Sequence, residues 1–314
     1  MAADALLTTL DATHRLLRRG RVTVLVRRGW EDALPVDEML SGAPLHAWGE
    51  AVPHSLTGRG GVHVLATLRG EIVAKRLQRG GVLGGFQRTW FADARRPLRE
   101  ALAAERLAQR GCRTPAIVAA RVRRGAFGLC RIESATPREA GAVDLLAALR
   151  GRGDRSALAV AVGRTLRAAH DAGMRHRDLQ AKNLLVPAGF PGPGGAREPL
   201  PLTILDLDRC SVGRPLTGPQ RTAALARLGR SLVKHGVLPG GAGPRGVPAN
   251  GLWACRAFFR AYGPLEDGTA GHALDRVARA VRRSVARHLP LWSGDQETGP
   301  EQHVEAPSER LADR

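Results

Sequence analysis

A polar stretch of eight residues, His-Arg-Asp-Leu-Gln-Ala-Lys-Asn at positions 176–183, stands directly before the apolar run 184–186. The apolar run predicts a strand, and the polar stretch predicts a short loop that leads into it. Transfer of a phosphoryl group needs a carboxylate that takes the proton of the acceptor hydroxyl and an amide oxygen that helps to hold Mg²⁺. We therefore predict Asp178 as a catalytic base and Asn183 as a metal ligand. The alternative is a polar surface turn before a buried strand.

The spacing of these residues resembles the catalytic loop of protein kinases, His-Arg-Asp-Leu-x-x-x-Asn. The resemblance implies that further parts occur in a fixed order. A glycine-rich loop and a strand lysine precede the catalytic loop, and a helix glutamate follows the lysine. A metal-binding aspartate ends a strand after the loop. The sequence offers candidates for each part.

The glycine cluster Gly58, Gly60 and Gly61 precedes two runs, 62–68 and 71–77, that predict a β-hairpin. Glycines let backbone N–H groups close over phosphates without a Cβ in the way. Lys75 follows Val-Ala on the second strand, as in the lysine strand of kinases, and it is one of three lysines in a chain with 48 basic residues. We predict that the glycines and Lys75 bind ATP; a solvated lysine at a strand end is the alternative.

Leucines at helical spacing between Arg96 and Arg110, followed by Gly111, predict a helix with a glycine at its end. The resemblance to kinases implies that this helix supplies the glutamate that pairs with Lys75. Glu100 is the first candidate for that role and Glu105 the second. A solvated surface acid is the alternative for either.

Two more strands, predicted at 114–120 and 127–133, complete an antiparallel sheet of about five strands. The resemblance then makes 133–137, beginning with Glu133, the hinge that meets the adenine ring of ATP. A helix with Ser156 as N-cap is predicted at 156–173, directly before the catalytic loop.

An apolar strand at 202–205 ends in two acids, Asp206 and Asp208. This is the position of the Asp-Phe-Gly metal motif of kinases. Asp206 follows the strand directly and is our predicted Mg²⁺ ligand, with Asp208 as the second choice.

The fold class expected from this order is α+β: a two-lobed protein-kinase-like fold with a small antiparallel-sheet N-lobe and a mainly helical C-lobe. The expected organisation is an N-terminal extension at 1–50 with one helix and one strand, the sheet lobe at 51–133, the helical lobe at 134–292 with a Pro/Gly-rich insertion at 187–201, and a disordered tail at 293–314.

A formal net charge of +19 over 314 residues favours anionic partners, such as an acidic membrane surface or a phosphorylated substrate. GC-rich coding, which replaces Lys by Arg, is the alternative explanation. No apolar run predicts a membrane span, and the first ten residues do not resemble a signal peptide. The four cysteines are scattered, which predicts reduced thiols in a cytosolic protein.

The whole set of motifs resembles the lipopolysaccharide core kinases of the protein-kinase-like fold over residues 55–236. Three features resemble kinases of 3-deoxy-D-manno-octulosonic acid (Kdo) most: Arg-Gly-Gly at 79–81, Asp-Leu-Asp-Arg at 206–209 and the helical stretch 225–232. Two features depart from the patterns compared. Arg177 makes the loop more like a protein kinase, and no Ala-Pro-Glu activation segment is present in the sequence.

The resemblance implies Mg²⁺-dependent transfer of the ATP γ-phosphate to Kdo in a lipid A-linked acceptor. It also implies a peripheral location at the cytoplasmic face of the bacterial inner membrane. A heptose kinase or a small protein kinase is the alternative within the fold, and a pseudokinase scaffold is another. A basic nucleic-acid-binding protein is the alternative from a different class. Aromatic residues make up only 4% of the chain, so few side chains are present on which nucleic-acid bases could stack. Nucleic acid is therefore not the expected partner.

Overall fold

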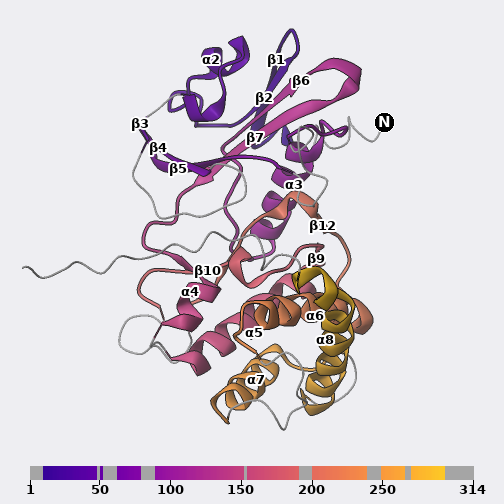
Figure 1. Cartoon of the computed structure of the whole chain (residues 1–314). Coiled ribbons are helices and arrows are strands. Elements are labelled where there is room, and N and C mark those ends of the chain that lie inside the picture. Colours follow the sequence, from indigo (N-terminus) through magenta and orange to yellow (C-terminus); the bar gives the residue numbers. More distant parts are fainter. Residues whose placement is uncertain are drawn as a thin grey trace, which may run out of the picture.

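The structure, a computed structural model, describes residues 10–47, 50–51, 62–78, 89–151, 154–190, 200–238, 249–265 and 270–293. A β-sheet lobe lies at one end of the molecule and a helical lobe at the other (Figure 1). The predicted two-lobed, protein-kinase-like α+β fold is confirmed. The glycines at positions 58, 60 and 61, the Arg-Gly-Gly turn at 79–81, most of the insertion and the tail after Ser293 lie outside the described residues.

The N-lobe is built on one antiparallel sheet of seven strands in the order β1-β2-β6-β7-β5-β4-β3. The strands are β1 (His14–Arg19), β2 (Val22–Arg27), β3 (Glu50–Ala51), β4 (Val62–Thr67), β5 (Gly70–Arg76), β6 (Ala119–Arg124) and β7 (Cys130–Pro137). The register pairs Lys75 with Ser134 and Arg76 with Glu133, so the members of each pair share one face of the sheet.

The N-terminal segment differs from the expected extension, because residues 14–27 form two strands of this sheet. The expected helix rested on leucines at positions 6, 7, 10, 16 and 17. Its extension through Leu16 and Leu17 is wrong, since both lie in β1. The helical spacing of the leucines is outweighed by the valine-rich run 22–26, which pairs with β1 on one side and β6 on the other. Gly20, with φ +55°, makes the turn between β1 and β2.

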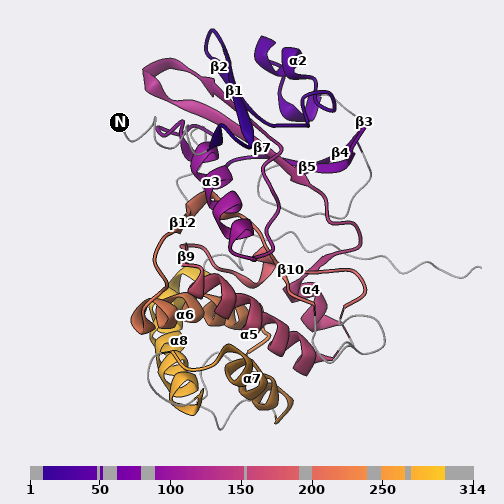
Figure 2. The ribbon, with the colours of Figure 1, turned by 180° about the vertical axis from the view of Figure 1, so that it is seen from behind.

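Helix α3 (Arg96–Gln109) lies beneath the sheet and faces the helical lobe (Figure 1 and Figure 2). Its buried face, which includes Ala101 and Leu102, packs against Leu25, Ile117 and Ala120 of the sheet side. The helix ends as predicted before Gly111, whose φ of +77° suits glycine. This packing fixes the direction in which the side chain of Glu100 points.

The C-lobe contains the helices α4 (Leu145–Arg150), α5 (Arg155–Asp171), α6 (Gly218–Lys234), α7 (Ala249–Tyr262) and α8 (Ala270–Ser293), while α2 (Val36–Ser41) lies on the sheet lobe. Asp154, and not the predicted Ser156, is the N-cap of α5, because its Oδ1 accepts the N–H groups of residues 156 and 157. Among the described helices, none has the length and apolar character of a bilayer span.

Short strands surround the catalytic loop in the C-lobe. They are β8 (Val143–Asp144), β10 (Leu184–Val186) and β11 (Thr203–Ile204) in one small sheet, and β9 (Met174–His176) and β12 (Cys210–Val212) in another. The catalytic loop therefore starts at the end of β9 and leads into β10. Leu179 within the loop and Leu184 directly after it are buried in the C-lobe core.

A close crossing of α5 and α7 holds the C-lobe together, and it depends on Gly163. A Cβ at this position would lie 2.6 Å from the backbone oxygen of Phe258. Gly163→Ala gains about 1 kcal/mol of helix propensity. The atoms that the new Cβ would meet belong to the backbone of α7, however, and they cannot move aside as the end of a flexible side chain can. We expect a net loss of about 2 kcal/mol in the free energy of unfolding, measured by urea denaturation.

Gly213→Ala is the matched control, because a Cβ there meets no atom within 4 Å and its φ is not positive. It should change stability by no more than a few tenths of a kcal/mol. Equal stability of the two variants would contradict the close helix crossing.

Candidate active site

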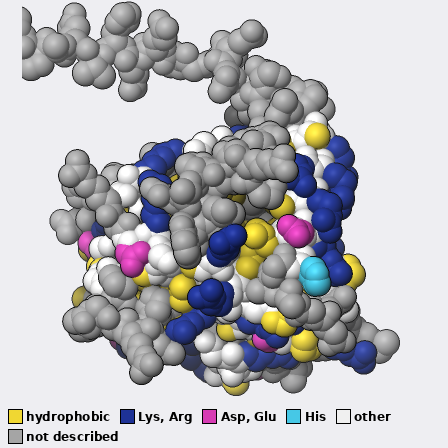
Figure 3. Space-filling view, turned by 90° about the horizontal axis from the view of Figure 1, so that it is seen from below, with side chains coloured by type: hydrophobic (Ala, Val, Ile, Leu, Met, Phe, Trp, Pro, Cys, Tyr) yellow, Lys and Arg dark blue, Asp and Glu magenta, His cyan; other side chains and the backbone are white. Residues whose placement is uncertain are grey.

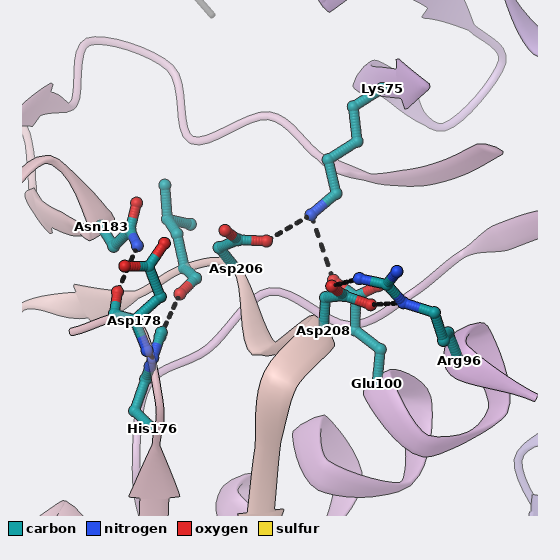
Figure 4. Close-up of polar contacts among 9 residues, drawn as sticks. Lys75, Arg96, Glu100, His176, Asp178, Asn183, Asp206 and Asp208 are labelled. Carbon is teal, nitrogen blue, oxygen red and sulfur yellow. Dashed lines mark hydrogen bonds and ion pairs between the residues drawn. The ribbon is translucent and has the colours of Figure 1, made fainter. Parts of the chain in front are cut away.

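Figure 4 shows the side chains that the sequence predicted for chemistry gathered at the junction of the two lobes. Lys75 comes from β5, Glu100 from α3, and Asp206 from the turn after β11. Asp178 and Asn183 lie on the catalytic loop on the side of Asp206 away from the lysine. The structure thus brings five of the predicted residues to one place.

Lys75 reaches this place because successive side chains of β5 point to opposite faces of the sheet. Ile72 and Ala74 are buried in the core on one face of the sheet, so the lysine side chain leaves the other face, towards α3. Its Nζ lies 3.2 Å from Oε1 of Glu100 and 3.1 Å from Oδ1 of Asp206. A single ammonium therefore joins the sheet, the helix and the C-lobe.

The charges of this group follow from burial and from each other. Burial by itself lowers the pKa of Lys75, but the carboxylates of Glu100 and Asp206 outweigh it and raise the pKa above its ordinary value. Burial raises the pKa of Glu100, which Lys75 offsets only in part. Burial acts in the same direction on Asp206, but there Lys75 prevails and the pKa is lowered. At neutral pH Lys75 is a cation and Asp206 an anion.

Glu100, and not Glu105, is the partner of Lys75. Glu105 lies five residues further along α3 and forms an ion pair with Arg27 of β2. Glu100 is 3% exposed, and its second oxygen, Oε2, has no hydrogen-bond partner in the part of the chain that the structure describes. The geometry decides between the two predicted candidates.

The two acids after β11 also have different partners. Asp206 stands in the left-handed region, at φ 59° and ψ 58°, which turns its carboxylate towards Lys75. Asp208 instead forms a two-pronged ion pair with Arg96 of α3, with Nε 2.7 Å from Oδ1 and Nη2 close to Oδ2. The guanidinium also lies over the ring of Phe91, 4.4 Å from its centroid. Asp206 therefore keeps an oxygen for a ligand, while Asp208 is used within the protein.

His176 fixes the catalytic loop against the strand that carries Asp206. Its Nδ1 accepts the backbone N–H of Asp178 at 3.2 Å, so its Nε2 carries the proton and donates to the carbonyl of Leu205 at 3.0 Å. Burial lowers the pKa of His176, which keeps the ring neutral at physiological pH. Asp178 and Asp206 are held in register by one buried imidazole.

Asn183 is oriented by its own loop. Its Nδ2 donates to the carbonyl of Asp178 at 2.9 Å, which leaves Oδ1 as the free end of the amide (Figure 4). Gln180 donates from Nε2 to Oδ1 of Asp178 at 2.6 Å, so the other carboxylate oxygen remains for a proton. Gln180 was not among the predicted site residues, although it lies two positions after Asp178 in the motif.

These donors suit Mg²⁺ shared with phosphates. Mg²⁺ prefers oxygen ligands and is commonly bound by one or two protein oxygens together with substrate phosphates. Oδ1 of Asn183 and the ionised carboxylate of Asp206 are such ligands. Within the described ranges no group of three or more His, Cys, Asp or Glu could hold a metal alone, and a site of this kind does not require one.

The hinge prediction at Glu133 is wrong. Residue 133 lies within β7, which continues to Pro137, and its side chain is on the face of the sheet opposite Lys75. Its carboxylate lies 2.7 Å from Nη1 of Arg121, 3.3 Å from Arg76 and 3.2 Å from the N–H of Leu45. A buried acid with these partners holds the outer layer of the N-lobe together, so the carboxylate has no access to the lysine side of the sheet.

Ser231 of α6 is a further residue that the sequence reasoning did not assign to the site. Its Oγ accepts the N–H of Ala181 at 3.2 Å, in the middle of the catalytic loop. It lies in the stretch 225–232 that resembled Kdo kinases, and this was the only signal for it.

Exchange of Glu100 for Gln tests the lysine pair. The variant removes the charge that holds the ammonium, and Lys75 is then drawn to Asp206 alone. We expect kcat/KM for ATP to fall by roughly 100-fold, because the predicted contact of Lys75 with the phosphates depends on the position of its ammonium group. The measurement is steady-state ADP release.

Glu105→Gln, on the same helix, is the control and should retain near-normal activity. If it loses as much activity as Glu100→Gln, the assignment of the lysine partner is wrong.

The chain is similar to proteins of known family. The model of the lipopolysaccharide kinase (Kdo/WaaP) family matches residues 46–240. A solved structure described as WaaP in complex with acyl carrier protein is similar, with 21% identity and a TM-score of 0.47, over 87% of this chain and 98% of that one. A search of curated proteins returns no match. The family model spans more than half of the chain, and the protein belongs to the lipopolysaccharide kinase (Kdo/WaaP) family.

Proposed function

We propose that this protein transfers the γ-phosphate of ATP to a hydroxyl of Kdo in the lipid A-linked inner core of lipopolysaccharide. The observation that carries the proposal is the contact of Lys75 with both Glu100 and Asp206, beside the loop that holds Asp178. A lysine paired with a helix glutamate, next to a metal-binding aspartate, is the arrangement by which kinases position the phosphates of ATP.

Each side chain has a task in the reaction. Lys75, held as a cation, binds the ATP phosphates, and Gly58, Gly60 and Gly61 remain predicted contacts of the same phosphates. Bound Mg²⁺ would neutralise phosphate charge, held by oxygens of Asn183 and Asp206. Asp178 accepts the proton of the acceptor hydroxyl while the oxygen bonds to the γ-phosphorus and the bond to ADP breaks. Gln180 keeps one oxygen of Asp178 occupied and the other available.

The choice of Kdo rests on the form of the motifs at 206–209 and 225–232. The ion pair of Asp208 with Arg96 supports this form, because it gives the second acid a structural role where protein kinases have a glycine. The hydrogen bond from Ala181 to Ser231 supports the second motif in the same way. Heptose is the alternative acceptor within the family.

The test is phosphorylation of defined acceptors with Mg-ATP, followed by mass spectrometry of the product. Kdo-lipid A without heptose should be phosphorylated, and Asp178→Asn should lower kcat by roughly 100-fold to 10,000-fold, because it removes the proton acceptor. Asp37→Asn, an exposed acid on α2, is the matched control and should leave kcat unchanged.

The acceptor series separates the parts of the proposal. Transfer only to heptose-bearing acceptors would contradict Kdo as the substrate and leave the kinase intact. Absence of transfer to every sugar acceptor, with ATP still bound, would contradict the function itself.

We further propose that the protein acts as a peripheral protein at the anionic cytoplasmic face of the inner membrane. The tip of the β6–β7 hairpin supports this. Phe127 is 99% exposed there and stands at φ 55°, a conformation unusual for a bulky residue. Arg123 and Arg124 beside it are exposed, and the adjoining turn carries Arg21, whose carbonyl accepts the N–H of Arg124. An aromatic ring among arginines suits a surface of anionic lipids.

Phe127→Ser tests this contact with vesicles rich in phosphatidylglycerol, measured by co-sedimentation. Burial of one Phe side chain contributes about 1.5–3 kcal/mol, so we expect affinity to fall by roughly tenfold or more. Leu68→Ser is the control: Leu68 is 87% exposed but lies on the β4–β5 turn, at the opposite end of the sheet. Equal loss in both variants, or none in Phe127→Ser, would contradict the proposed contact.

A further inference from the structure

Basic side chains gather over the end of the helical lobe, with few acidic ones between them (Figure 3). Elsewhere, arginines that are largely buried have a carboxylate partner: Arg96 pairs with Asp208, Arg121 with Glu133 and Arg221 with Asp171. Two half-buried arginines of α6 lie near the catalytic loop without such a partner. Arg227 and Arg230 are half-buried, yet neither forms an ion pair with an acid in the described ranges.

Helix α6 presents these arginines on the side that meets the catalytic loop. Positions 227, 230 and 231 are spaced i, i+3 and i+4, so they share one side of the helix. Ser231 fixes the direction of that side, because its Oγ accepts the N–H of Ala181 in the loop. Arg230 therefore stands next to the part of the chain that carries Asp178.

Helix α8 completes the surroundings of Arg230. Gly229 allows Val281 to approach so closely that a Cβ on the glycine would lie 2.5 Å from it. One turn further along α8, Nη1 of Arg230 donates to Oγ of Ser284 at 3.1 Å and contacts Nε2 of His288 at 3.2 Å. Its Nε and Nη2 form no hydrogen bond with the described residues. The guanidinium is thus oriented by neutral groups, with two donor positions left for a ligand.

The charged groups around Arg230 are mostly cations. Burial lowers the pKa of Arg230, and the nearby cations Arg227 and Arg287 lower it further. The one carboxylate that opposes this effect is Asp178. Arg227 also lowers the pKa of His176, which places it near the same loop. Half-buried like charges cost free energy unless a counter-charge is bound, and here no counter-charge comes from the described protein beyond the catalytic acid.

We propose that Arg230, together with Arg227 and Arg287, binds an anionic group of the acceptor, a carboxylate or a phosphate, and so sets the reacting hydroxyl against Asp178. The inference rests on the proposed kinase function and adds the residues that recognise the acceptor. A guanidinium matches both anions with paired hydrogen bonds. The anion neutralises the arginines at the moment when the acceptor is in place.

The basic helix α8 positions Arg230 in the proposed site. Ser284 and His288 orient Arg230, and Arg287 adds charge beside it. Arg279 and Arg282 lie on the opposite side of the helix and are exposed. Only the side that packs on α6 belongs to the proposed site.

Binding of small probes tests the inference. The charged probes are free Kdo, a sugar carboxylate, and mannose 6-phosphate; their neutral counterparts are Kdo methyl ester and mannose. Affinities are measured by isothermal titration with Mg-ADP present. We expect Arg230→Gln to weaken at least one charged probe by about tenfold or more while neutral probes bind both proteins alike. The probe that responds identifies the carboxylate or the phosphate as the group that is bound.

Three further variants serve as controls. Arg279→Gln, a matched change on the outer side of α8, should bind like the wild type, and Arg230→Lys should recover part of the affinity because it keeps the charge. Arg227→Gln should weaken the same probe if Arg230→Gln does not fold. Equal affinity of wild type and both Gln variants, or no binding of any charged probe to the wild type, would overturn the inference. Charge-dependent binding without phosphoryl transfer to any acceptor would support the anion site and contradict the proposed function.

Discussion

The structure depends on one ammonium group that three distant segments share. Lys75 of β5 is held by Glu100 of α3 and by Asp206 of the turn after β11, so a change in the position of any of these elements moves the ammonium group. The pair with Glu100 is not an efficient source of stability. Burial raises the pKa of that carboxyl, its second oxygen has no partner in the described protein, and buried ion pairs recover their desolvation cost only in part. The contribution of this ion pair is instead to fix the position of the Lys75 ammonium.

The short segment 205–208 is where the other constraints meet. The carbonyl of Leu205 is bound by His176, the side chain of Asp206 by Lys75, and that of Asp208 by Arg96. The left-handed backbone at Asp206 makes this possible, because it turns one acid towards the lysine and leaves the other towards α3. Strain at one residue thus allows two acids that are two positions apart to contact Lys75 and Arg96 separately.

Much of the site could be predicted from the sequence because its signals are local. Asp178, Asn183 and Asp206 lie in or directly after short stretches whose spacing resembles kinase motifs, and the helix with Glu100 has a clear period and end. The choices that failed depend on contacts between distant segments. The strand nature of residues 14–27 depends on pairing with β6, and the place of Glu133 depends on the strand register with β5. The partners of Asp208 and Ala181 come from other elements altogether.

The arginines of this chain differ in whether they have a carboxylate partner. GC-rich coding is one explanation for arginine in place of lysine, but it says nothing of where carboxylate partners are absent. Arg96, Arg121 and Arg221 show that buried guanidinium groups in this fold acquire carboxylates. Arg227 and Arg230 are half-buried near the catalytic loop, and neither has a carboxylate partner in the described ranges. A requirement for a bound anion at that place accounts for the difference, since the counter-charge then arrives with the substrate.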